Sequence, residues 1–295
     1  MKHVLALPDS QRLAQQLAGE LGCDWSPLDV HRFPDGESLV RIESPVQGRS
    51  VILAGSLDHP DAKVLPLLFA VDAARELGAT RIGLVAPYLA YMRQDARFHP
   101  GEAVSSRSFA RLLSASLDFL VTVDPHLHRW HDLGQIFSIV PRAVSAMPAM
   151  ADWIRAEVPA PLLVGPDAES EQWVAHAAQL LAAPYIVLRK TRMGDDQVRI
   201  DAPAADRWPG RTPVLVDDIV STGSTLAMTA GVLRAAGLPA PVCVAVHALI
   251  DAAGLARLTA AGIARFVSCN TVDHPTNAID VSPLLGEALR QLNLP

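Results

Sequence analysis

The chain has 295 residues, of which 50% are hydrophobic and 19% charged, a composition that excludes a protein disordered over most of its length. A formal net charge of −6 leaves no excess of positive charge for holding DNA or RNA, so no nucleic-acid partner is expected. The 3 cysteines include no CxxC pair, which argues against a disulfide framework and a thiolate metal site and favours a reducing compartment, the cytoplasm.

Short apolar runs alternate with longer helical patterns, which is typical of βαβ units feeding a largely parallel sheet. The first run ends at Pro8 and Asp9, too early for an export signal, and no uncharged apolar stretch reaches the roughly 18 residues of a membrane span. Helices are predicted over 10–21 and 61–77, where leucines recur at helical spacing and Gly22 and Gly78 follow. Strands are predicted at 4–7, 51–54, 82–86, 119–123, 162–164, 185–188, 214–216, 242–247 and 266–268.

The alternation pauses at 141–148 and restarts with a helical pattern near 149–158. We therefore predict an α/β protein with two domains, residues 1–145 and residues 146–295, each a mostly parallel sheet flanked by helices. In open α/β sheets ligands bind where loops leave the carboxyl ends of the strands, so functional residues are expected there.

The stretch 214–226, VLVDDIVSTGSTL, combines an apolar strand with a polar turn that enters a helix. Such a turn presents backbone N–H groups and a helix dipole to an anion, and Gly223 lets the backbone approach closely. Ser221, Thr222, Ser224 and Thr225 add hydroxyl donors. We predict a phosphate-binding loop, with Asp217 and Asp218 accepting hydrogen bonds from sugar hydroxyls or holding a metal. The alternative is an ordinary turn capped by Asp218, and the absence of GxxxxGK[ST] excludes a P-loop.

This stretch resembles the phosphoribosyl-diphosphate binding loop shared by the phosphoribosyltransferases and the ribose-phosphate diphosphokinases, also called phosphoribosyl-diphosphate synthetases. Other segments resemble the diphosphokinase family alone, in the same order and over nearly the whole chain. The resemblance implies two phosphoribosyltransferase-like domains, with ATP on the N-terminal side and ribose 5-phosphate on the C-terminal side. It assigns ribose 5-phosphate to Asp217, Asp218, Ser221, Thr222, Gly223, Ser224 and Thr225.

Two N-terminal motifs are assigned to ATP by the resemblance. Residues 33–37, FPDGE, match a family loop that contacts adenine from a neighbouring subunit, which implies a homo-oligomer, at least a dimer. Phe33 offers a stacking face and Asp35 and Glu37 offer acceptors, although the residues alone equally suit a solvated hairpin. Residues 87–113 resemble the family's PYFGYARQD segment and its continuation, which assigns Arg93, Gln94 and Asp95 to ATP, with Ala96 where the family usually has arginine.

The resemblance also implies a metal site for Mg²⁺. Residues 123–131, VDPHLHRWH, resemble a segment whose histidine helps to hold the metal, which assigns His126, and VGPD at 164–167 adds Asp167. His128 and His131 lie nearby, but Mg²⁺ prefers oxygen ligands and no cysteine supports a zinc site, so these two are expected in loop or interface roles. Glu169 and Ser170 replace two family glycines, and a carboxylate there repels diphosphate unless it turns away or binds metal.

Residues 188–199, LRKTRMGDDQVR, resemble the family's mobile K-x-R loop. Lys190 and Arg192 lie two apart after a strand, so both side chains can converge on transferring phosphates, the alternative being an exposed charged hairpin. The resemblance implies transfer of the diphosphoryl group of ATP to the C1 hydroxyl of ribose 5-phosphate, giving phosphoribosyl diphosphate and AMP. Two alternatives remain: a phosphoribosyltransferase that consumes phosphoribosyl diphosphate, and a non-catalytic regulatory paralogue.

Overall fold

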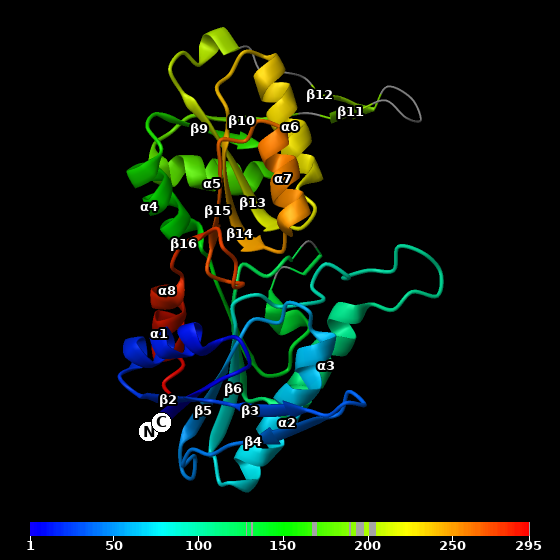
Figure 1. Cartoon of the computed structure of the whole chain (residues 1–295), viewed down its shortest axis with the longest axis vertical. Helices are drawn as coiled ribbons and strands as arrows, with labels where there is room; N and C mark the ends of the chain where they lie inside the picture. The colour runs from blue at the N-terminus through cyan, green and yellow to red at the C-terminus, as the bar shows by residue number, and fades with distance from the viewer. Residues whose placement is uncertain are drawn as a thin grey trace. The chain divides into compact units, whose positions relative to one another are not determined.

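The computed structural model describes residues 1–127, 129–130, 132–166, 170–188, 190–192, 198–200 and 205–294 (Figure 1). By its contacts the chain divides into two compact units. Unit 1 consists of Met1–Ser145, Thr271–Asp273 and Val281–Pro295, and unit 2 consists of Ala146–Asn270 and His274–Asp280. None of the helices in the described part of the chain is long and apolar enough to cross a membrane.

Unit 1 is built on a six-stranded parallel sheet with the strand order β2-β1-β5-β6-β7-β8. Its strands are β1 (Lys2–Ala6), β2 (Asp24–Pro27), β5 (Ser50–Ala54), β6 (Arg81–Ala86), β7 (Phe119–Val123) and β8 (Val140–Val144). Its helices are α1 (Gln11–Leu21), α2 (Asp61–Glu76), α3 (Ser105–Ser116), the short η1 (Leu133–Gln135) and α8 (Ser282–Gln291). Figure 1 shows α1 and α8 on one face of this sheet and α2 and α3 on the other.

Unit 2 repeats the plan, with a six-stranded parallel sheet in the order β10-β9-β13-β14-β15-β16. Its strands are β9 (Pro161–Gly165), β10 (Tyr185–Val187), β13 (Thr212–Val220), β14 (Val242–Ala248), β15 (Arg265–Cys269) and β16 (Asn277–Ile279). Its helices are α4 (Met147–Glu157), α5 (Glu171–Leu181), the short η3 (Ala205–Arg207), α6 (Ser224–Ala235) and α7 (Ala252–Ala260). Helices α4 and α5 contact each other, as do α6 and α7.

Each unit carries an antiparallel hairpin at the same place in its connectivity. In unit 1, β3 (Asp29–Arg32) and β4 (Ser38–Arg41) lie between the second and third strands of the sheet in chain order. In unit 2, β11 (Lys190–Arg192) and β12 (Val198–Ile200) occupy the corresponding position. The FPDGE motif, predicted to contact adenine, and the K-x-R motif, predicted to act on the transferring phosphates, therefore lie on equivalent hairpins of two similar sheets.

The central strands are buried on both faces, as parallel sheets covered by helices require. Every residue of β5 is buried, as is every residue of β7. Gly83 on β6 lies opposite Phe119 on β7, and a Cβ at Gly83 would lie 2.3 Å from the Phe119 ring. The aromatic ring thus occupies the space that the glycine leaves open. The predicted α/β fold with two mostly parallel sheets is confirmed.

The C-terminal segment lies in a different unit from the one that the expected domain boundaries gave it. Helix α8 packs against α1, β7 and β8 of unit 1, although it follows the last strand of unit 2 in the chain. The contact with α1 is close, since a Cβ at Gly286 would lie 2.7 Å from the Glu20 Cβ. By contacts, residues 281–295 therefore belong with residues 1–145 rather than with a second domain of residues 146–295.

Candidate active site

The strand order locates a binding position in each unit. In unit 1 the chain first adds β2 on one side of β1 and then continues with β5 on the other side, so the strand order reverses between β1 and β5. In unit 2 it reverses in the same way between β9 and β13. At such a switch point the loops from adjacent strands leave in opposite directions and open a crevice at the carboxyl ends. In unit 2 this position lies after Gly165 of β9 and Val220 of β13, where the predicted phosphate loop begins.

Asp217 and Asp218 lie inside β13, which extends to Val220 rather than ending at 216 as expected. Asp217 Oδ1 accepts a hydrogen bond from the N–H of Asp218 at 3.0 Å, and Asp218 Oδ1 accepts one from the N–H of Ile219 at 2.8 Å. Burial raises the pKa of the Cys243 thiol on the adjacent strand, and the negative charge of Asp217 adds to the increase. Both half-buried carboxylates are therefore oriented by the backbone at the end of the strand.

Gly223 begins helix α6 with a left-handed backbone, φ 70°. A Cβ at this position would lie 2.8 Å from Leu258 Cδ2 and 3.0 Å from Ile250 Cδ1, so packing beneath the loop also requires glycine. This reason differs from the expected one, since the glycine accommodates neighbouring side chains of its own unit. Thr222 Oγ1 donates to Ser224 Oγ at 3.1 Å and accepts from the Ser224 N–H at 3.3 Å.

The amino end of α6 suits an anion. Gly223 at the N-cap has no side chain, the N–H of Ser224 donates to Thr222 Oγ1, and no acidic residue lies in the first turn of the helix. The first N–H groups of a helix lack partners within it and carry partial positive charge. The loop from Ser221 to Thr225 therefore combines hydroxyl groups with a helix amino terminus, as the sequence predicted.

Gly165, the last residue of the neighbouring strand β9, packs against Ser170. A Cβ at Gly165 would lie 2.6 Å from Ser170 Oγ, so the missing side chain at 165 makes room for this hydroxyl. Ser170 precedes α5 and is one of the two positions at which the resemblance implies glycine. Asp167 and Glu169 lie outside the described residues. Lys190 and Arg192 are alternate positions of β11, paired with Ile200 and Val198 of β12.

In unit 1, the loop that follows β6 holds Arg93 and Gln94 at the surface but Asp95 inside. Asp95 is only 6% exposed. Its Oδ1 accepts from Arg129 Nη1 at 2.8 Å and its Oδ2 accepts from the Arg129 backbone N–H at 3.2 Å. The carboxylate thus joins the loop after β6 to the loop after β7.

The loop after β7 carries the predicted metal ligand His126, which is half-buried. Asp124, at the end of the strand, adopts φ 32°, an uncommon backbone for a residue other than glycine, and its N–H donates to Val144 O at 2.9 Å. Within the described residues no group of three His, Cys, Asp or Glu side chains is placed to hold a metal, and His128 and His131 lie outside them. Mg²⁺ is usually held by one or two carboxylates together with substrate oxygens and water, and Asp124 lies two residues before His126 on this loop.

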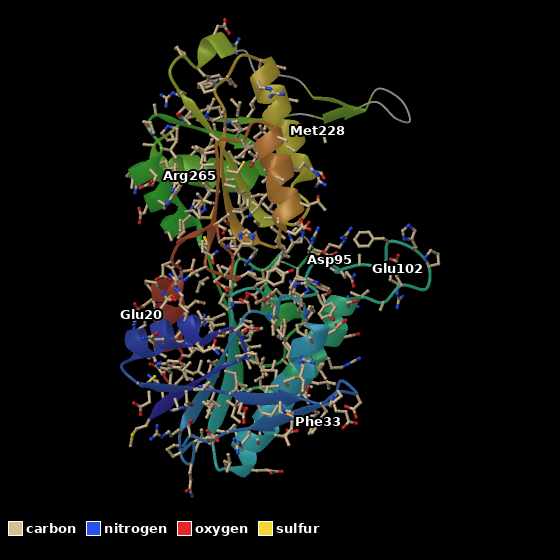
Figure 2. All side chains as sticks on the ribbon, viewed as in Figure 1. Glu20, Phe33, Asp95, Glu102, Met228 and Arg265 are labelled. Carbon is tan, nitrogen blue, oxygen red and sulfur yellow. The ribbon has the colours of Figure 1, made fainter. Side chains whose placement is uncertain are left out.

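The FPDGE motif forms the tip of the β3–β4 hairpin. The N–H of Phe33 donates to Glu37 O and the N–H of Gly36 donates to Phe33 O, both at 2.9 Å, while Asp35 Oδ1 accepts from the Glu37 N–H at 3.1 Å. The Phe33 ring is 40% exposed and meets His31 edge to face, with ring centroids 4.7 Å apart. Figure 2 shows Phe33 on this hairpin, well separated on unit 1 from Asp95.

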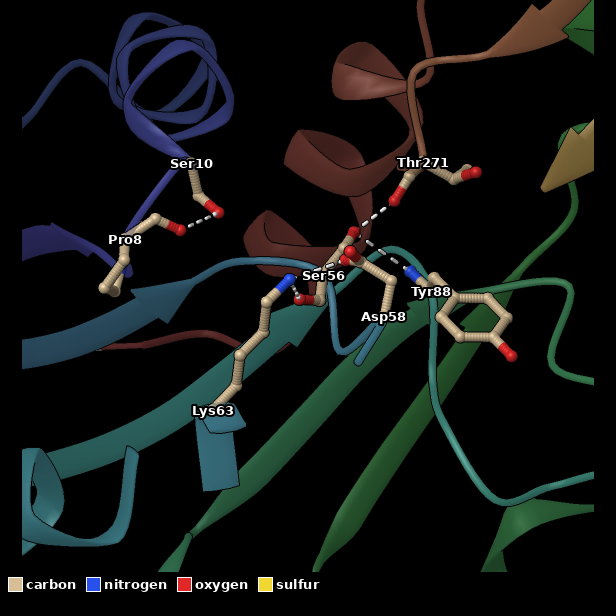
Figure 3. Close-up of polar contacts among 7 residues, drawn as sticks. All are labelled: Pro8, Ser10, Ser56, Asp58, Lys63, Tyr88 and Thr271. Atoms are coloured by element: carbon tan, nitrogen blue, oxygen red, sulfur yellow. Dashed lines mark hydrogen bonds and ion pairs between the residues drawn. The ribbon is translucent and has the colours of Figure 1, made fainter. Parts of the chain in front are cut away.

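At the switch point of unit 1 lies a polar cluster that the sequence did not indicate (Figure 3). Lys63 Nζ pairs with Asp58 Oδ1 at 2.7 Å and donates to Ser56 O at 3.0 Å. Ser56 Oγ donates to Thr271 O and accepts from the Tyr88 N–H at 3.4 Å. The only sequence signal is the place of these residues after an apolar strand. Because Lys63 is paired and α2 has Asp61 in its first turn, this loop is a poorer anion site than its counterpart in unit 2.

The chain matches known proteins over both units. Residues 2–116 match the N-terminal domain of ribose phosphate pyrophosphokinase, and residues 140–284 match the phosphoribosyl transferase domain. The chain is 35% identical to the ribose-phosphate pyrophosphokinase of Methanopyrus kandleri, over 98% of this chain and 99% of the relative. The chain belongs to the ribose-phosphate pyrophosphokinase family. The family name is a synonym of ribose-phosphate diphosphokinase, so the predicted family and enzymatic activity are confirmed.

A second family member and a solved structure agree. The ribose-phosphate pyrophosphokinase of Methanothermobacter thermautotrophicus is 30% identical over 97% of this chain and 99% of the relative. The crystal structure of phosphoribosylpyrophosphate synthetase from Mycobacterium smegmatis superposes with a TM-score of 0.85 and 24% identity, covering 99% of each chain. At that identity the superposition supports the fold of the pyrophosphokinase family in this chain.

Proposed function

We propose that this protein transfers the β,γ-diphosphoryl group of ATP to the C1 hydroxyl of ribose 5-phosphate. The C1 oxygen forms a bond to Pβ, the bond from Pβ to the α,β-bridging oxygen breaks, AMP leaves, and the hydroxyl proton is lost. The observation that carries the proposal is the match to both domains of the pyrophosphokinase family over almost the whole chain. Such a transfer needs alignment and neutralisation of charge more than covalent help from the protein.

The acceptor side of the reaction is assigned to unit 2. The 5-phosphate binds the amino end of α6 and the loop Ser221, Thr222, Gly223, Ser224 and Thr225, which the absence of first-turn acidic residues supports. Asp217 and Asp218 accept hydrogen bonds from the ribose hydroxyls. Lys190 and Arg192, on the β11–β12 hairpin, neutralise the charge that develops on the transferring group. Their closing over it excludes water that would otherwise hydrolyse ATP.

The donor side is assigned to unit 1. Phe33, held exposed at the hairpin tip, stacks on adenine, and Asp35 and Glu37 accept hydrogen bonds from the base or sugar. Arg93 and Gln94 bind the phosphates from the loop after β6. Asp95 supports ATP binding by holding that loop to Arg129. The separation of Phe33 from Asp95 fits a hairpin that serves a neighbouring subunit, so the active form is a homo-oligomer, at least a dimer (Figure 2).

His126 and Asp167 are the residues that would hold Mg²⁺. The metal, when bound, supplies charge neutralisation at the phosphate oxygens. Its product, phosphoribosyl diphosphate, assigns the enzyme to nucleotide biosynthesis. The cysteine usage supports a reducing compartment, the cytoplasm.

The test is an assay of the purified protein with ATP, ribose 5-phosphate and Mg²⁺. We expect AMP and phosphoribosyl diphosphate to form in equal amounts, with neither product when ribose 5-phosphate is left out. Release of diphosphate from phosphoribosyl diphosphate and a nucleobase, without AMP formation in the first assay, would identify a phosphoribosyltransferase instead. Binding of both substrates with no turnover would identify a regulatory paralogue.

A further inference from the structure

Helix α7 lies against the loop that precedes α6, and Figure 1 shows the two helices side by side. Arg257 on α7 donates from Nη1 to the carbonyl oxygen of Thr222 at 2.6 Å. At Gly223, the residue that follows Thr222, the side chains of Leu258 and Ile250 fill the space where a Cβ would lie. A polar and an apolar contact from the same helix region thus meet two consecutive residues of the loop.

The start of α7 is itself held firmly. Asp251 Oδ1 caps the helix by accepting from the Gly254 N–H at 2.8 Å. The His274 ring lies with Nε2 at 2.9 Å from Ile250 O, so Nε2 carries the proton, because a carbonyl oxygen can only accept. These contacts come from residues outside the phosphate loop. They make the Ile250–Leu258 region a fixed support beneath it.

The orientation of one peptide group follows from the Arg257 contact. In a planar trans peptide the C=O of one residue and the N–H of the next point in opposite directions. Since Arg257 holds the carbonyl of Thr222 toward α7, the N–H of Gly223 points away from α7. Glycine has no Cβ, so rotation of this peptide is less restricted on the Gly223 side, and the Arg257 contact favours one orientation.

We propose that Arg257 is a positioning residue for ribose 5-phosphate: it fixes the Thr222–Gly223 peptide so that the Gly223 N–H faces the 5-phosphate. This inference rests on the proposed function of the loop. Arg257 acts through the backbone, and its guanidinium does not contact the phosphate. Its removal leaves the hydroxyl groups of the loop in place but lets the peptide rotate, which weakens binding of the sugar phosphate and leaves ATP binding alone.

The experiment compares the wild type with Arg257→Met, which keeps the length of the side chain but removes the donor, and with Arg257→Lys, which keeps a donor. Calorimetry should show the dissociation constant for ribose 5-phosphate rising about tenfold in Arg257→Met, as expected for loss of one hydrogen bond to a charged group, with partial recovery in Arg257→Lys. The KM for ATP and kcat at saturating ribose 5-phosphate should stay within about twofold. The control is Arg234→Met, which removes another exposed arginine from unit 2 and should change none of these values.

The dependence of ribose 5-phosphate affinity on salt concentration separates positioning from direct contact. If Arg257 acts through the peptide, the loss of affinity in Arg257→Met persists at high salt concentration, where the Coulomb effect of the removed charge is screened. A loss that disappears at high salt would mean that the guanidinium attracts the phosphate by its charge and would overturn the inference, as would unchanged affinity in that variant. Failure of the wild type to bind ribose 5-phosphate would instead refute the proposed function of the loop.

Discussion

Both oxygens of the Asp95 carboxylate accept hydrogen bonds from Arg129, one from its guanidinium and one from its backbone N–H. The Asp95 carboxylate is therefore hydrogen-bonded within the protein, although Asp95 belongs to a motif that the sequence assigned to ATP. The Arg129 guanidinium also lies 5.6 Å above the Phe98 ring, farther along the Asp95 loop. At the scale of single residues, a carboxylate of the motif supports its neighbours Arg93 and Gln94 by fixing the loop that presents them.

A double-mutant cycle tests the role of this pair. Asp95→Ala and Arg129→Ala are each expected to raise the KM for ATP about tenfold, because either change frees the loop. The double variant should be little worse than either single variant, with a coupling free energy of about 1–2 kcal/mol. Arg111→Ala, at an exposed position of α3, serves as the control. Additive effects would show that Asp95 contacts ATP on its own account.

His3 predicts a pH dependence of stability. Burial, and secondly the positive charge of Arg49, lower the pKa of His3 below its usual value of 6.5, against a smaller opposing effect of Asp24. Between the two pKa values the unfolded chain binds more protons than the folded chain, so the free energy of unfolding falls as pH is lowered through 6.5. Urea unfolding from about pH 8 to about pH 5 should show this decrease, and His3→Gln should flatten it. An equal slope in both proteins would assign the dependence to other groups.

At the scale of elements, the phosphate loop depends on the helix beneath it. Gly223 combines a positive φ with close contacts to Leu258 and Ile250, so its conformation is determined by α7 as much as by the loop. Gly231, farther along α6, has no atom within 4 Å of a Cβ position. Neighbouring side chains therefore exclude a Cβ at Gly223, whereas they leave room for one at Gly231.

Alanine substitutions at these glycines are expected to change the free energy of unfolding in opposite directions. Gly223→Ala introduces a strained φ and an overlap with Leu258, so it should weaken ribose 5-phosphate binding more than about tenfold and lower the free energy of unfolding by about 1–3 kcal/mol. Gly231→Ala should raise that free energy by about 0.5–1 kcal/mol, because glycine is unfavourable in a helix interior, and leave binding unchanged. Calorimetry and urea unfolding measure both quantities. Wild-type affinity in Gly223→Ala would contradict the assignment of the loop.

At the scale of the whole molecule, the chain repeats one sheet connectivity and inserts a hairpin at the same point of each repeat. One hairpin carries Phe33 and the other carries Lys190. At its switch point unit 2 has a helix terminus with no acidic residue in the first turn, whereas unit 1 has the Lys63–Asp58 ion pair there. The same architecture has thus acquired different chemistry in its two copies.

Complementation between variants tests whether the active site is shared between subunits. Phe33→Ala should raise the KM for ATP, and Lys190→Ala should lower kcat by about 10²–10³, because a charge beside the transferring group acts mainly in the transition state. Hybrid oligomers formed by co-expression should regain activity, since some sites then receive Phe33 from one chain and Lys190 from another. Activity no higher than the sum of the separate variants would argue against a shared site.

Local patterns in the sequence were sufficient for the fold class and the family. Apolar runs such as Val51–Ala54 are uniformly buried because parallel strands face helices on both sides, and this is why they stand out along the chain. The strands that escaped prediction include β2, β8 and β16, which are edge strands, two of them with proline, whose partly exposed residues carry no such signal. The order of the short motifs then identified the pyrophosphokinase family.

Contacts between segments far apart in the chain have no local signature in the sequence and form only when the elements pack. Arg290 of α8 donates to Glu20 O at 2.8 Å across 270 positions, and Asp95 meets Arg129 across 34, yet neither pair has a local pattern to reveal it. The need for glycine at 223 is of the same kind, because the atoms that exclude a side chain belong to Ile250 and Leu258. Sequence periodicity records which face of an element is buried, whereas the identity of the residue that covers it depends on how the elements pack.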